Sequence, residues 1–201
     1  MYQKISNKFA SFQDAPINVQ QIEDELRKGG HVETVEFIKA SDLDQDIVWG
    51  VHYRYTHRPR PYAEPVDVVA VVSSEKLDMA QRRLVCAKEL IHSCDSDWIQ
   101  ADTPRDIALW LEKLMQNGEK LISSPGTIGT AMAIFDNLAI WQALDLLFPA
   151  TIREIALEAL VAGTKTPQEI AAWVDLPLDM VQIVLDEDWP HIREICRDLC
   201  R

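Results

Sequence analysis

Apolar and polar residues alternate along two parts of the first half of the chain, and a third part is an apolar run; together these patterns predict three strands. In residues 47–56, Trp49, Val51, Tyr53 and Tyr55 share one parity, while the other parity includes His52. Because successive side chains of a strand point to opposite faces, this period of two predicts a strand with two different faces. Residues 32–38 alternate more weakly. Residues 66–72 are nearly all Val and Ala, so we expect a central strand covered on both sides.

A period of three to four residues predicts helices over most of the remaining chain. The first covers 16–28 and stops at two glycines, and the next is capped by Ser73 or Ser74 and runs to about Ser93. Thr103 and Pro104 begin another helix. A loop is expected over 121–130 and a long apolar helix over 131–148. Beyond Pro149, the expected helices are 151–162, 167–174, 178–185 and one that starts at Pro190.

This order of elements predicts an α+β fold, with a small antiparallel or mixed sheet packed on helices and a mainly helical C-terminal half. The chain has 201 residues, which is one large domain or a domain with an appendage. We expect a domain over residues 1–150 and a helical extension over 151–201 that packs on it.

The composition narrows the classes of partner. With 47% hydrophobic residues the chain can bury a core, and its net charge of −12 disfavours nucleic acid as a partner. The densest basic stretch, residues 54–60, is the local exception. No apolar run approaches the ~20 residues of a bilayer-spanning helix, and the first residues do not form a signal peptide. We therefore expect a cytoplasmic protein, no membrane partner, and free thiols at all four cysteines.

Candidate chemistry lies in the predicted helix that ends near Ser93. In an H-E-x-x-H helix, two imidazoles four residues apart meet one zinc ion, and the Glu acts as general base on the metal-bound water. Glu89 and His92 stand in the Glu and second His positions. Lys88 occupies the first His position, where a protonated ammonium has no lone pair to offer a metal.

The stretch around these residues resembles the ImmA/IrrE family of zinc metallopeptidase-like proteins, whose helix reads A-H-E-L-x-H. Downstream, residues 136–149 are similar to the family's helix E-x-x-A-x-x-F-A-x-x-L-L-M-P, and Asp136 stands where the family has its third metal ligand, a Glu. Residues 166–181 are similar to the helix-turn-helix-like segment that follows. The strand over 66–72 also fits, so the resemblance covers roughly residues 66–186 and implies a zincin-like domain.

The departures from the family pattern lead to two interpretations of this site. In the first, the charge of Lys88 between Glu89 and Asp136 replaces the metal ion, so the protein has no cofactor and no peptidase activity. The resemblance then implies a regulatory protein-interaction module whose partner is a protein such as a transcriptional regulator. In the second, His92, Asp136 and Asp95 form an altered zinc site, and Glu89 serves as base in an active peptidase that cleaves a regulator.

A third hypothesis concerns the C-terminal helix pair. A DNA-binding regulator would read bases with the second helix of such a pair, over 178–186. That helix carries Asp179 and Asp186 rather than basic residues, which disfavours DNA reading.

Overall fold

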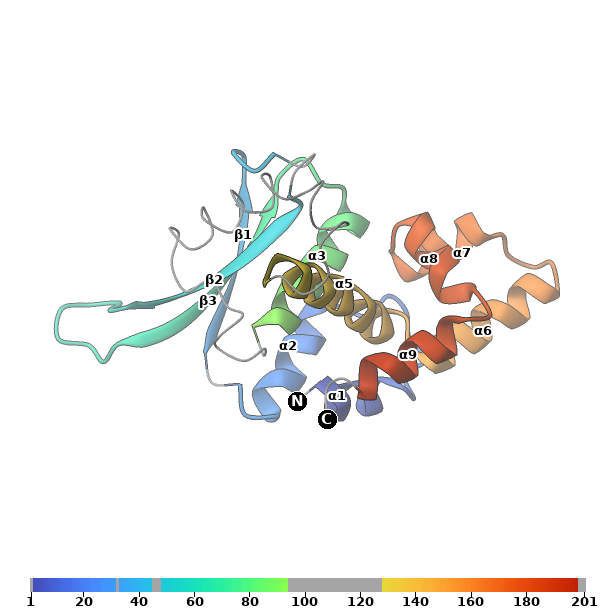
Figure 1. Cartoon of the computed structure of the whole chain (residues 1–201), viewed down its shortest axis with the longest axis horizontal. Coiled ribbons are helices and arrows are strands. Elements are labelled where there is room, and N and C mark those ends of the chain that lie inside the picture. The colour runs from blue at the N-terminus through green and yellow to red at the C-terminus, as the bar shows by residue number, and fades with distance from the viewer. Residues whose placement is uncertain (1, 32, 45–47, 94–127, 199–201) are drawn as a thin grey trace.

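The computed structural model describes residues 2–31, 33–44, 48–93 and 128–198, of which 128–137 are described by their backbone alone. A three-stranded sheet and the helices packed beside it lie toward one end of the molecule, and a group of C-terminal helices lies toward the other (Figure 1). The architecture is therefore α+β, as the sequence predicts.

The sheet is mixed and has the order β1-β3-β2. Its strands are β1 (Thr34–Ala40), β2 (Gly50–His57) and β3 (Val66–Ser74). β3 pairs in parallel with β1 and antiparallel with β2. All three strands predicted from the sequence are present, with bounds shifted by a few residues. The central strand is indeed covered on both sides, since Val68 to Val72 are all buried.

The two faces of β3 belong to different cores. Val69 and Val71 join the main hydrophobic core, which the helices supply. Ala70 and Val72 join a smaller cluster with Val51 on the opposite face. The period of two along the strands thus directs one set of side chains toward the helices and the other set away from them.

Three helices from distant parts of the sequence surround the main core beside the sheet (Figure 1). They are α2 (Val19–Lys28), α3 (Met79–His92) and α5 (Ile128–Leu147), and α3 packs against the other two as well as against β2 and β3. The predicted cap of α3 at Ser73 or Ser74 is wrong. The strand continues through Ser74, and Asp78 caps the helix by accepting a hydrogen bond from the Gln81 backbone N–H at 2.8 Å.

An additional helix, α1 (Tyr2–Phe9), was not predicted from the sequence. It packs against α5, where the buried Asp145 carboxylate accepts hydrogen bonds from Tyr2 at 2.7 Å and from Ser6 at 2.5 Å. Arg193 of the last helix forms an ion pair with the same carboxylate. One buried acidic group therefore joins the first helix, α5 and the last helix.

The C-terminal helices follow the predicted bounds closely. They are α6 (Ala150–Val161), α7 (Pro167–Val174), α8 (Leu178–Leu185) and α9 (Trp189–Asp198). Arg83 of α3 donates to the carbonyl oxygens of Val174 at 2.5 Å and Asp175 at 2.6 Å, so α3 contacts this part of the chain directly. The helix predicted after Thr103 lies outside the described residues, and α5 begins inside the segment expected to be a loop. Cys86 and Cys196 are not in disulfide bonds, as expected.

Candidate functional site

Helix α3 carries the predicted site residues on a face that is turned inward. Glu89 is 3% exposed and His92 is 8% exposed, and the side chain of Lys88 is 13% exposed. Helix α3 owes this placement to its buried apolar residues, which include Leu84, Ala87 and Leu90. The ionisable groups are therefore enclosed rather than solvated.

Both oxygens of the Glu89 carboxylate have a neighbour that can carry positive charge. The Lys88 Nζ lies 2.9 Å from Oε1 and forms an ion pair with it. The His52 Nδ1 lies 2.9 Å from Oε2, and because a carboxylate only accepts, the imidazole donates this hydrogen bond. The rings of His52 and His92 are stacked, with centroids 5.6 Å apart and planes 17° from parallel. The four side chains thus form one cluster, in which Glu89 and His92 are buried and Lys88 and His52 are partly buried.

The pKa of Glu89 is set by opposing effects. Burial acts most strongly and raises the pKa, because it penalises the charged form. The charge of Lys88, the hydrogen bond from His52 and the charges of His52 and His92 together outweigh burial, so the pKa of Glu89 lies below its ordinary value of 4.5. A carboxylate held in this way is a weak proton acceptor, since a general base works best with a pKa near the working pH.

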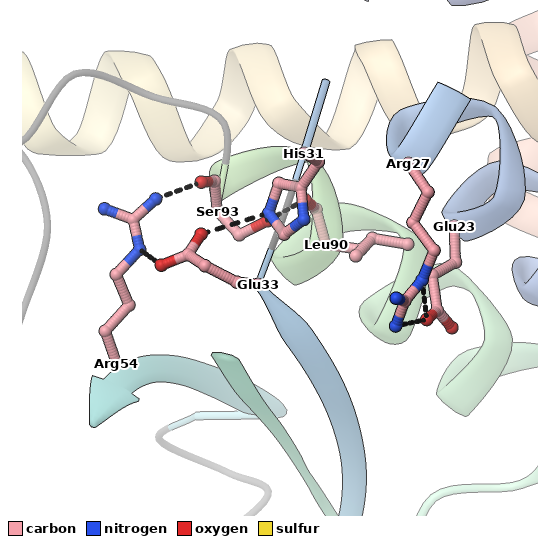
Figure 2. Close-up of polar contacts among 7 residues, drawn as sticks. All are labelled: Glu23, Arg27, His31, Glu33, Arg54, Leu90 and Ser93. Atoms are coloured by element: carbon pink, nitrogen blue, oxygen red, sulfur yellow. Dashed lines mark hydrogen bonds and ion pairs between the residues drawn. The ribbon is translucent and has the colours of Figure 1, made fainter. Parts of the chain in front are cut away.

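A second polar cluster contacts the C-terminal end of α3, one turn beyond Glu89. Arg54 forms an ion pair with Glu33 at 2.7 Å and donates to the backbone oxygen of Ser93 at 2.6 Å (Figure 2). The Ser93 hydroxyl donates to the carbonyl oxygen of Leu90 at 2.6 Å. Arg54 satisfies a carbonyl that the end of a helix leaves without an intrahelical partner. The predicted basic stretch 54–60 therefore does not act as a unit, because its first residue is committed to the fold.

His31 is the buried member of this second cluster. Its Nε2 lies 3.3 Å from the Ser93 hydroxyl and 3.3 Å from a Glu33 oxygen (Figure 2). Burial lowers the pKa of His31 below its ordinary value of 6.5, and this effect exceeds the opposing charge of Glu33. Its enclosure therefore favours the neutral form of His31.

The structure brings some of the predicted site residues together, and others lie outside its described part. Lys88, Glu89 and His92 come together, as the helix spacing predicts. Asp136 lies on α5, which packs against α3, but its side chain is outside the described part of the chain, and so is all of Asp95. Among the described residues, no three His, Cys, Asp or Glu side chains converge as metal ligands. The ammonium at the first-ligand position does not fit a zinc ion, so we derive no chemistry through one.

Sequence reasoning did not single out His52 as a site residue. Its signal lies in the alternation of β2, which puts His52 and Arg54 on the same face, and in the structure both side chains reach α3. What the alternation does not give is which helix covers that face.

Comparison of the chain with protein-family models, with curated proteins and with solved structures found no match. The resemblance to the ImmA/IrrE family therefore remains a prediction. In the part of the chain that the structure describes, no helix combines the length and the apolar character needed to cross a bilayer.

Proposed function

We propose that the chain is a degenerate ImmA/IrrE-like metallopeptidase that lacks peptidase activity and acts as a regulatory protein-interaction module. The observation that carries this proposal is the engagement of both Glu89 oxygens, by the Lys88 ammonium and by the His52 imidazole.

The chemistry of a zincin helix explains why this matters. Its glutamate must accept a proton from a metal-bound water, and the residue before it must supply a neutral nitrogen to the metal. Here the residue before Glu89 supplies a positive charge, which attracts the carboxylate and repels a cation. The ion pair of Lys88 with Glu89 and the hydrogen bond from His52 can stabilise α3 against the sheet without a metal ion.

The nature of the partner follows from charge and from the resemblance. The family resemblance implies an association with transcriptional regulators, and the net charge of −12 disfavours binding to DNA itself. Helix α8, which would be the DNA-reading helix, has the exposed Asp179 in its first turn. A protein partner therefore agrees with the charge better than a nucleic acid does.

Metal analysis of three forms of the purified protein tests the proposal. The wild type should retain zinc far below one ion per chain after dialysis against zinc and then against buffer. Lys88→His supplies an imidazole four residues before His92, so this variant should bind zinc at least tenfold more tightly than the wild type. Lys88→Met is the matched control, because it removes the ammonium without adding a ligand, and it should stay free of zinc.

The outcomes separate the hypotheses. Stoichiometric zinc in the wild type would contradict the proposal and favour the altered metal site with His92, Asp136 and Asp95. In that case Glu89→Gln should abolish cleavage of a partner protein while the fold is retained. Retardation of DNA in a gel shift at low salt would instead favour the DNA-binding hypothesis.

A further inference from the structure

The hairpin formed by β2 and β3 extends from the body of the molecule as a two-stranded arm (Figure 1). Only the last pairs of this hairpin, Thr56 with Asp67 and His57 with Val66, lie beyond the end of β1, because β1 pairs with β3 from Val68 onward. The loop that follows them therefore lies past the edge of the three-stranded sheet. We define the arm tip as residues 58–65.

The arm tip presents a combination of side chains that is typical of protein-protein contacts. Arg58 and Arg60 are exposed, and Tyr62 is 101% exposed with a φ of 68°. Tyrosine and arginine dominate the energetics of many interfaces, and prolines stiffen the loop that carries them here. Positive φ is uncommon for a residue other than glycine, and Tyr62 adopts it while its side chain is fully exposed. The hydrophobic core therefore does not require this conformation.

The opposite end of the molecule has a complementary surface on α6. Ile152 and Ala156 face the core at 0% exposure, and the outer face carries an exposed stripe of acidic and apolar side chains. On a helical projection these side chains fall within about a third of the circumference. The stripe consists of Glu154, Ile155, Glu158 and Val161, the last of which is 90% exposed.

Three arginines of this C-terminal region make hydrogen bonds or ion pairs outside the stripe, although Arg153 also interacts electrostatically with Glu154. Arg153 donates to the backbone oxygens of Val184 and Asp186, at 2.6 and 2.7 Å. Arg193 pairs with Asp145, and Arg197 donates to the Ser6 hydroxyl. Glu154 and Glu158 are exposed, so cations of another molecule can reach their carboxylates.

We propose that the arm tip of one chain docks on the α6 stripe of a second copy of this chain. Arg58 and Arg60 face Glu154 and Glu158 in this contact, and the Tyr62 ring covers Ile155 and Val161. The arm and α6 lie at opposite ends of the long axis, so a chain does not reach its own α6 (Figure 1). Two copies arranged antiparallel about a two-fold axis make the contact twice, which closes the assembly as a dimer.

Sedimentation and light scattering over a concentration series test this proposal. At about 50 mM NaCl, where charges are less screened, the mass of the wild type should rise from 22.9 kDa toward twice that value, and dimerisation should weaken with added salt. Arg58→Glu with Arg60→Glu should weaken dimerisation at least tenfold, and so should Tyr62→Ala alone. Lys4→Glu with Lys76→Glu is the matched control. It changes the net charge equally at exposed sites away from the arm, and it should dimerise like the wild type.

A charge exchange makes the test specific for α6. Glu154→Lys with Glu158→Lys should be monomeric alone, and the same should hold for the double arginine variant. A mixture of the two variants should recover a heterodimer, in which one contact is the wild-type contact and the other is restored with reversed charges. A wild type that stays monomeric at all concentrations would overturn the proposal. So would a mixture that fails to associate, or an arm that retards duplex DNA while the protein remains monomeric.

Discussion

Replacing Lys88 with methionine should destabilise the protein, because Glu89 would then keep its charge in a buried site after losing its nearest cation. Removing one partner of a buried ion pair typically costs about 3–5 kcal/mol. The hydrogen bond from His52 remains, and the Lys88 side chain keeps 13% exposure, so the full cost does not apply. We expect a loss of about 2–3 kcal/mol in the free energy of unfolding.

A double-mutant cycle isolates the pair from the other contacts of Lys88. In Lys88→Met with Glu89→Gln the buried charge is gone, so about 1–2 kcal/mol of the loss should be recovered as coupling energy. Urea denaturation at pH 7 measures both values, and thermal denaturation should show Tm lowered by about 4–12 °C in the single variant. Lys28→Met removes an exposed ion pair with Glu25 and should leave Tm nearly unchanged.

The pH dependence gives an independent check. The pKa of Glu89 lies below 4.5 in the folded state, so its contribution to stability is present above 4.5 and is lost as the pH falls through the folded pKa. The stability difference between the wild type and the double variant should therefore shrink in acid. If Lys88→Met is as stable as the wild type at pH 7, or if the double variant is no better than the single one, the electrostatic account of this cluster is wrong.

Three further predictions concern the rest of the fold. Asp145→Ala removes the acceptor that Arg193 and two hydroxyls share, so the free energy of unfolding should fall by about 2–4 kcal/mol, measured by urea denaturation; an unchanged midpoint would contradict this role. The pKa of His31 is depressed in the folded state, so its contribution to the free energy of unfolding is present above pH 6.5 and is lost as the pH falls through the folded pKa. In thermal scans between pH 7 and 5, His31→Asn should lack this loss. Equal slopes of Tm against pH in the variant and the wild type would count against this role. Gly50→Ala places a methyl group against the Val85 side chain and 2.8 Å from a β3 carbonyl oxygen, so it should cost about 1–3 kcal/mol by chemical denaturation, whereas a neutral effect would mean that the strand can shift.

The sequence predicted the elements with strong periodicity and failed where a tertiary contact decides. The strand over 66–72 is unmistakable, because its apolar run suits a strand that is buried on both faces. The helix α1 escaped prediction because it is short and polar overall, and its inward residues Tyr2 and Ser6 are held by Asp145, far along the chain. No local sequence pattern predicts a contact between residues so far apart in the chain.

Only part of the candidate site was predicted, because the rest of it also depends on contacts between distant elements. Lys88, Glu89 and His92 share one helix, so their spacing alone brings them together. His52 comes from a strand, and its partner depends on how the sheet packs on α3, which the alternation within β2 does not encode. Cross-element contacts of this kind require the packed structure.

The strand order β1-β3-β2 also bears on how the chain assembles. The β2–β3 ribbon pairs neighbouring segments through a short loop, so its closure loses little entropy. β1 pairs in parallel with β3, on the edge of β3 opposite to β2. This pairing joins residues that are much farther apart in the sequence than those of the ribbon, so it closes a longer loop. We therefore expect the ribbon to form early in folding and β1 to be the last strand added, which makes β1 the first strand to detach when the native state opens locally.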